Sequence, residues 1–230
     1  MGSRSKTDQT ERAAGSAEGT DLVYGLHAVR EMLRAGTRPL SRLVVARSDR
    51  RFADLIRLAR AAGVPVHIEP HPVLDRLAPQ ARHQGVIALV AAKAYVEPEA
   101  ILAHVRDSGR PALLLVLDGV QDPHNLGAIL RTAEAAGVHG VFLPERRAVG
   151  LTAAVAKASA GALEYLRVAR VGNLSRLIEW LQAEGVWVYG LEAGAPKAYT
   201  AVDWRGPVAL VVGGEGQGTR PGVLAKCDDR

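Results

Sequence analysis

Short, fully apolar segments alternate with helical patterns through the second half of the chain, and this alternation constrains the fold most. Residues 113–117 (LLLVL) and 208–212 (VALVV) are uninterrupted apolar runs, as expected of strands buried on both faces. Further strands are predicted at 138–143, 166–169 and 186–191, and helices at 126–136, 152–159 and 174–183. The pattern predicts an α/β fold in which helices cover both faces of a parallel sheet.

The first half predicts a smaller α/β unit. Asp21 is a candidate cap for a first helix that contains Leu22, Leu26, Val29 and Leu33. Further elements are expected as strands at 43–45, 64–68 and 85–90 and helices at 52–62 and 71–77. The resulting division is a disordered tail (1–20), an α/β domain (21–92), a linker with a connecting helix (93–110) and a parallel-sheet domain (111–230).

Composition excludes several classes of protein. The single cysteine, Cys227, excludes a disulfide framework and a cysteine-based zinc cluster. The apolar runs are too short for a membrane span, and no charged-then-apolar leader opens the chain. His67 and His71 do not share a helix because Pro70 intervenes, so no metal site is expected. We expect a cytoplasmic protein that binds neither membrane nor metal.

The positive charge is concentrated in the first half. Residues 21–110 hold 14 Lys and Arg against 9 Asp and Glu, whereas residues 111–230 hold 12 of each. Arginine predominates among these cations, and its planar fork suits phosphate. The excess indicates either a surface that meets a polyanion such as RNA or an ordinary solvated basic surface, and composition leaves both open.

The first segment with candidate chemistry, DPHNLGAILRTA at 122–133, leads from the apolar strand at 113–117 into a helix. Asn125 either caps this helix or projects from its first turn. Gly127 weakens a helix, so a close approach by backbone, ligand or partner chain is expected there. Arg131 either belongs to a functional site or pairs with Glu134 on a solvated face.

The second segment, VVGGEGQGTRP at 211–221, follows the last predicted strand. Its four glycines around Glu215 allow backbone N–H groups to face a ligand and hold one carboxylate at the sheet edge. The spacing excludes both a dinucleotide fingerprint and a Walker A loop. The alternative is a tight glycine turn with a solvent-facing glutamate.

Together the two segments resemble the motifs of the SpoU/TrmH branch of the SPOUT RNA methyltransferases, most closely its bacterial 23S rRNA guanosine 2′-O-methyltransferase group. The segment YGLHAV at 24–29 resembles the opening of that group's small RNA-binding domain, and HQGV at 83–86 resembles its end. The first motif corresponds to 122–133 and the second to 212–216. The resemblance covers about residues 22–230.

The resemblance implies a C-terminal domain with a deep trefoil knot, a rare exception among folds. It implies S-adenosyl-L-methionine as cofactor, RNA as substrate (rRNA first, tRNA second) and a homodimer whose active site spans two protomers. The catalytic positions it implies are Asn125, Arg131 and Glu215. The cofactor-binding positions it implies are Leu191, Glu192, Ala193, Gly213, Gly214 and Gly216.

In the implied reaction a ribose 2′-hydroxyl attacks the activated methyl group, and positioning supplies most of the rate. Arg131 stands where the family's proposed base stands, but a guanidinium stays protonated. Our hypothesis is that Arg131 grips a neighbouring phosphate and stabilises the developing alkoxide. Asn125 would orient the ribose or Arg131, and Glu215 would pair with Arg131 or hold the substrate.

The sequence departs from the family in one respect. The family continues with a strand, a third motif built around Ser-Leu-Asn and a helix, whereas this sequence ends at Arg230. We therefore expect this 230-residue form, which is either a fragment of a longer gene product or a truncated relative, to bind S-adenosylmethionine poorly. The alternatives to this methyltransferase are a non-catalytic RNA-binding paralogue and, more weakly, a nucleotide-binding α/β enzyme.

Overall fold

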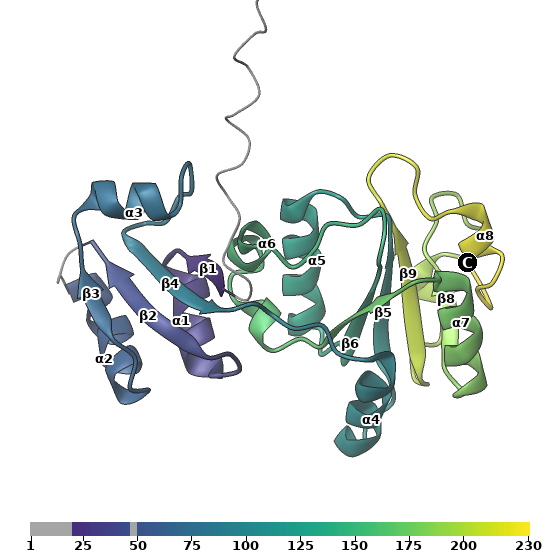
Figure 1. Ribbon diagram of the computed structural model, residues 1–230. Coiled ribbons are helices and arrows are strands. Elements are labelled where there is room, and N and C mark those ends of the chain that lie inside the picture. Colours follow the sequence, from purple (N-terminus) through teal and green to yellow (C-terminus); the bar gives the residue numbers. More distant parts are fainter. Residues whose placement is uncertain (1–19, 47–49) are drawn as a thin grey trace, which may run out of the picture.

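A computed structural model describes residues 20–46 and 50–230, which build two sheets (Figure 1). The expected tail at 1–20 lies outside the described residues except for Thr20. Across the described parts of the chain, no helix is both long and apolar enough to cross a bilayer. Nor do three or more His, Cys, Asp or Glu side chains gather there as a candidate metal site.

The first sheet has the strand order β1-β4-β2-β3. Strand β4 is antiparallel to both of its neighbours, and β2 and β3 are parallel. Its strands are β1 (Thr20–Tyr24), β2 (Leu40–Val45), β3 (Val66–Ile68) and β4 (Val86–Ala91). The accompanying helices are α1 (Leu26–Ala35), α2 (Ala53–Ala61) and α3 (His71–Leu77), with a 3₁₀ turn, η1 (Arg50–Phe52).

The start of the first helix was wrong in the sequence prediction. Asp21 and Leu22 lie in β1, and α1 begins only at Leu26 after Gly25, whose φ is +91°. Residues 20–24 pair with β4 along their whole length, so a long-range partner decides their conformation. Helical spacing of apolar residues could not reveal that partner.

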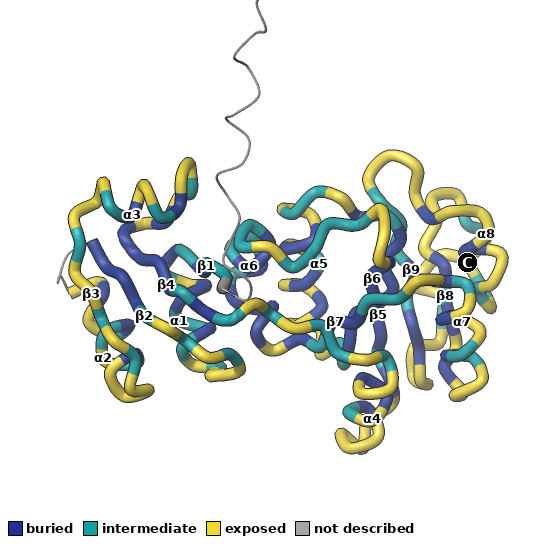
Figure 2. The backbone as a smooth tube through the Cα atoms, in the orientation of Figure 1, coloured by how far each residue is buried: buried dark blue, intermediate teal, exposed yellow. Residues whose placement is uncertain are grey.

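Alternation along β2 gives the first sheet two covered faces. Leu43 and Val45 pack with α1 and α2, whereas Val44 packs with Leu74 of α3. This follows from the two-residue period of a strand. Figure 2 shows the buried backbone of β2 and β4 between exposed helix surfaces.

The second sheet is entirely parallel, with the order β7-β6-β5-β9-β8. Its strands are β5 (Leu113–Asp118), β6 (Gly140–Pro144), β7 (Val168–Val171), β8 (Trp187–Gly190) and β9 (Val208–Gly213). The helices are α4 (Pro98–Ser108), α5 (Pro123–Ala135), α6 (Ala153–Ala158), α7 (Leu174–Ala183) and α8 (Pro221–Leu224), with 3₁₀ turns η2 (Ala162–Glu164) and η3 (Tyr199–Ala201).

Helices cover both faces of this sheet, which confirms the predicted α/β class. Leu115 and Leu117 of β5 face the cluster that contains α5 and α6, whereas Leu114 and Val116 face α4 and α7. The carboxyl ends of the parallel strands consequently share one edge. In an open α/β sheet, ligands bind at that edge.

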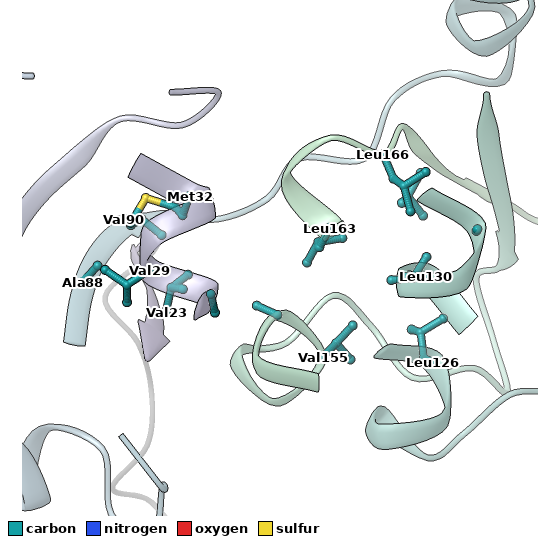
Figure 3. Close-up of a cluster of buried hydrophobic side chains, with 14 of the residues drawn as sticks. Val23, Val29, Met32, Ala88, Val90, Leu126, Leu130, Val155, Leu163 and Leu166 are labelled. Atoms are coloured by element: carbon teal, nitrogen blue, oxygen red, sulfur yellow. The ribbon is translucent and has the colours of Figure 1, made fainter. Parts of the chain in front are cut away.

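The two sheets are joined by one continuous apolar cluster. Val29 and Met32 of α1 belong to the same cluster as Val155 of α6 and Leu163 of η2 (Figure 3). Beside it, Arg38 pairs with Glu164, and these side chains are only 5% and 2% exposed. The Arg38 Nε donates to the Glu164 carboxylate over 3.0 Å. Apolar packing and a buried ion pair therefore fix α1 against η2.

Candidate active site

Two loops meet where β5 and β9 end side by side. Asp118 is paired with Gly213 in the last register position, and the Gly214 N–H donates to the Asp118 carbonyl over 2.8 Å. Figure 1 shows both loops at the upper edge of the sheet. The polar turn at 118–122 and the loop at 213–218, here called the glycine loop, are therefore neighbours, as the parallel topology requires.

Glycine is needed in this loop because backbones approach one another closely. A Cβ at position 213 would lie 2.0 Å from the Thr219 nitrogen, and a Cβ at 214 would lie 2.1 Å from the Gly119 carbonyl oxygen. Such contacts are far below van der Waals separation. The sequence interpretation expected these glycines to face a ligand, whereas Gly213 and Gly214 first serve this backbone packing.

Asn125 and Glu215 are brought together by the two loops. The Asn125 Nδ2 donates to the Glu215 Oε1 over 2.9 Å, and the N–H groups of Asp122 and Gln121 donate to the same carboxylate over 3.2 and 3.3 Å. The Asn125 bond, followed by backbone N–H bonds, lowers the pKa of Glu215 from 4.5 to about 2. Glu215 is therefore an anion at neutral pH, with several of its acceptor positions occupied.

The N-terminus of α5 differs in detail from the expectation. Asp122 is the cap, because its side chain accepts the His124 N–H over 2.8 Å. Asn125 accordingly projects from the first turn, which is one of the two expected placements, and its amide is free to reach Glu215. Gly127 packs on α6, where a Cβ would lie 2.3 Å from the Ala158 Cβ, so the expected close approach is made by the chain itself.

A buried carboxylate that the sequence interpretation missed anchors the same edge. Asp118 is 2% exposed, and it accepts from the Arg220 backbone N–H and from the Arg220 Nε, both over 2.9 Å. This bidentate pairing fixes the end of the glycine loop to the end of β5. The available signal was an aspartate that directly follows a fully apolar strand.

Arg131 lies elsewhere in the protomer. It lines an open cavity of about 600 Å³ at the junction of the two sheets, together with His27 and Glu31 of α1, and no residue of the glycine loop lines this junction cavity. Among the described residues, its guanidinium has no hydrogen bond or ion pair, so the alternative pairing with Glu134 is not observed. The structure therefore joins Asn125 to Glu215, and among the described residues the expected pairing of Glu215 with Arg131 is not observed.

The candidate cofactor residues divide between two other cavities. Leu191, Glu192 and Ala193 line a cavity of about 460 Å³ beyond β8, here called the β8 cavity. Gly214 and Gly216 line a separate cavity of about 390 Å³ beside Asp118, Gln121 and Arg147. Gly213 lines neither of these. The side chains that could hold a ligand in the β8 cavity include Tyr189, Lys197, Tyr199, Trp204 and Arg230.

Each half of the chain matches the model of a known protein family. The model of the SpoU rRNA Methylase family matches residues 112–230, and the model for RNA 2′-O ribose methyltransferase substrate binding matches residues 22–96. The first match spans the second sheet with both loops of the candidate site. The second match spans the first sheet.

Named relatives and solved structures agree with these matches. YacO of Bacillus subtilis, assigned to the TrmH family of tRNA/rRNA methyltransferases, is 42% identical over 90% of this chain and 84% of its own length. The 23S rRNA (guanosine-2′-O-)-methyltransferase RlmB of Coxiella burnetii is 42% identical over 90% of this chain and 83% of its own length. An AdoMet-bound rRNA methyltransferase from Sinorhizobium meliloti superposes with a TM-score of 0.71 at 25% identity, covering 91% of this chain and 76% of that one.

Proposed function

The chain belongs to the SpoU rRNA methylase family, and from this membership we propose that it methylates a ribose 2′-hydroxyl of structured RNA. The methyl donor is S-adenosylmethionine, and the acceptor is a guanosine of 23S rRNA. The observation that carries the proposal is the contact between Asn125 and Glu215 at the ends of β5 and β9. The pair places an amide and an anion at the sheet edge where ligands of open α/β folds bind.

The β8 cavity suits S-adenosylmethionine by its chemistry. The rings of Tyr189, Tyr199 and Trp204 offer apolar faces for an adenine. Glu192 and Arg230 form a loose ion pair over 3.9 Å. The Glu192 carboxylate can also accept from ribose hydroxyls or an ammonium group, and Arg230 can also meet a carboxylate. In contrast to the poor binding expected from the sequence, we propose that Leu191, Glu192 and Ala193 hold the cofactor there. When bound, the cofactor supplies an activated methyl group.

The protein's own residues orient the acceptor and manage its proton. Glu215, with a pKa of about 2, is too weak a base to take a hydroxyl proton near neutral pH. Its anion instead fixes the Asn125 amide, whose carbonyl oxygen remains available to the ribose. We propose that Arg131 grips the phosphate beside the acceptor ribose and stabilises the developing alkoxide, while the hydroxyl proton passes late in the reaction to that phosphate.

The separation of Arg131 from Glu215 supports a shared site in a homodimer. In a two-fold dimer, Arg131 of one protomer can serve the Asn125–Glu215 pair of the other. We propose that each active site is completed in this way. Within residues 20–46 and 50–230 the guanidinium of Arg131 has no partner, which is consistent with a role outside its own protomer.

The first sheet is proposed to bind the RNA. It lies within the segment that matches the substrate-binding family, and residues 21–110 carry the chain's excess of positive charge. Phosphate contacts by arginines position an RNA without reading its sequence. A ribosomal RNA substrate would be met in the cytoplasm, and we propose that location for the protein.

The test is transfer of labelled methyl groups to a 23S rRNA transcript, followed by nuclease digestion and mass spectrometry. The expected product is 2′-O-methylguanosine, formed by the wild-type protein and lost in the Asn125→Ala variant. Methylation of a base, or transfer that is independent of Asn125, would contradict the proposal. An Asn173→Ala variant, which alters the cap of α7, serves as the matched control and should retain transfer.

A further inference from the structure

The junction of the two sheets holds helix α1 in a fixed position over the end of η2. A Cβ at Gly161 would lie 2.3 Å from the Glu31 Cβ, so α1 packs directly on this glycine. The Tyr165 hydroxyl donates to the Glu31 carboxylate over 3.1 Å. With the buried Arg38–Glu164 pair, these contacts make the junction cavity a fixed feature of the molecule.

Both sheet units supply the walls of the junction cavity. Helix α1 contributes His27 and Glu31, and α5 contributes Arg131 and Glu134. The remaining lining residues belong to the 159–165 segment: Ser159, Ala160, Ala162 and Tyr165. At about 600 Å³ the cavity lies within the range of ligand pockets.

Some polar groups of the cavity are already engaged. Glu31 accepts from Arg34 over 3.0 Å as well as from Tyr165, and the Ser159 hydroxyl donates to the Ala156 carbonyl over 3.0 Å. By contrast, the side chains of His27, Arg131 and Glu134 have no hydrogen bond or ion pair within residues 20–46 and 50–230. The cavity therefore presents one free guanidinium, one free carboxylate and one free imidazole.

This set of groups matches a nucleotide whose base is guanine. A guanidinium binds a phosphate, and rings such as those of His27 and Tyr165 can stack on a base. A carboxylate binds two adjacent N–H donors, which guanine presents at N1 and N2 of its Watson–Crick edge. Adenine, cytosine and uracil each present a single donor group at that edge, next to a ring or carbonyl acceptor, so none of them offers a carboxylate two adjacent donors.

We infer that the junction cavity binds the acceptor guanosine, with its phosphate on Arg131 and its base edge on Glu134. This inference rests on the proposed function and deepens it, because it gives His27 and Glu134 a role in selecting the nucleotide. His27 comes from the substrate-binding half, so the base is read jointly by both halves of the chain. Glu134 is the specificity-determining residue, and His27 is a stacking residue.

Binding of free nucleotides tests the inference without cofactor or RNA. Equilibrium dialysis with labelled GMP and AMP should show GMP bound about tenfold more tightly, the size expected for hydrogen bonds to a charged group. Glu134→Gln should lower GMP affinity to that of AMP. Arg131→Lys should weaken both nucleotides alike because it loses the bidentate phosphate contact.

Controls separate these effects from general changes in charge or fold. Glu99→Gln on α4 and His67→Gln in β3 remove an exposed carboxylate and an exposed imidazole far from the cavity, and both should leave GMP binding unchanged. The melting temperature of each variant is measured first, and nucleotide binding is compared only among variants that melt at the wild-type temperature. Photo-crosslinking with 8-azido-GMP should label the peptide that contains His27 or Tyr165, and GMP should compete while AMP should not.

Equal affinity for GMP and AMP, no GMP binding at millimolar concentration, or cross-links outside the cavity would each overturn the inference. These results are independent of methyl transfer. A protein that binds GMP here but never methylates RNA would retain the nucleotide pocket and lose the proposed function. A protein that methylates RNA but shows no preference for GMP would retain the proposed function and lose the nucleotide pocket.

Discussion

Glu215 shows how one side chain can be fixed by its surroundings into a single charge state. Three N–H donors from Asn125 and the 121–122 backbone meet its carboxylate. Its position beside the first turn of α5 also places the anion near the positive end of a helix dipole. The carboxylate consequently links the glycine loop to α5 and keeps Asn125 oriented.

The pH dependence of stability follows from this contact. The folded pKa of about 2 lies below the usual 4.5, so the stabilisation is fully present above about pH 4.5 and is lost as pH falls toward 2. Because the side chain is exposed, we expect only about 1 kcal/mol. Urea unfolding from pH 3 to 7 should show Glu215→Gln less stable at pH 7, with the difference shrinking at pH 3. A difference that grows at low pH would contradict this role.

Gly127 should resist substitution even though alanine favours helices. A Cβ at this position would lie 2.3 Å from the Ala158 Cβ, so Gly127→Ala should cost about 1–3 kcal/mol through overpacking. Gly222→Ala in α8, where nothing lies within 4 Å of the added Cβ, should leave stability unchanged or slightly higher. Denaturant midpoints of the two variants provide the comparison, and equal midpoints would show that α6 can move away.

At the scale of elements, local pattern predicted most of the second sheet. The strands at 113–117 and 208–212 are observed as β5 and β9, and the helix at 174–183 has the same bounds as α7. These segments carry their signal within themselves, as continuous apolar runs or a strong 3.6-residue period. Asn125 and Glu215 both follow strands of one parallel sheet, which predicts that they share an edge, but the sequence paired neither with the other, and their contact is a finding of the structure.

The remaining features depend on partners that spacing does not reveal. The strand at 20–24 forms because β4 lies beside it. The Asp118–Arg220 anchor joins residues about a hundred positions apart. The cavity that Arg131 lines is completed by residues of α1, from the other half of the chain. Contacts of this kind are set by tertiary packing, to which residue propensities contribute little.

The Arg38–Glu164 pair is the element-scale contact whose loss should be most damaging. Both side chains are almost fully buried, so Arg38→Met should destabilise the protein by about 3 kcal/mol by leaving a buried charge unpaired. The Arg38→Met/Glu164→Met double variant should lose less than the sum of the single variants. Arg106→Met, which breaks an exposed pair with Glu184, should cost at most about 1 kcal/mol. Additive losses in urea unfolding would contradict this coupling.

For the whole molecule, the uneven distribution of charge predicts how RNA binding responds to salt. Phosphate contacts by the arginines of the first sheet should make the logarithm of the binding constant fall linearly with the logarithm of salt concentration. Arg60→Gln, which removes an exposed cation at the end of α2, should reduce that slope by about one. Filter binding to a 23S rRNA fragment measures both. A flat salt profile would exclude the first sheet as the RNA-binding surface.

Subunit complementation tests the central claim, a site shared between two protomers, most directly. Asn125→Ala and Arg131→Ala should each abolish methyl transfer alone. When the two variants are mixed and allowed to exchange subunits, the mixture should recover about a quarter of wild-type turnover. Half of the dimers then contain one subunit of each variant, and one of the two sites in each of these dimers is intact. If the mixture stays inactive after subunit exchange has been shown, Arg131 does not complete the partner's site.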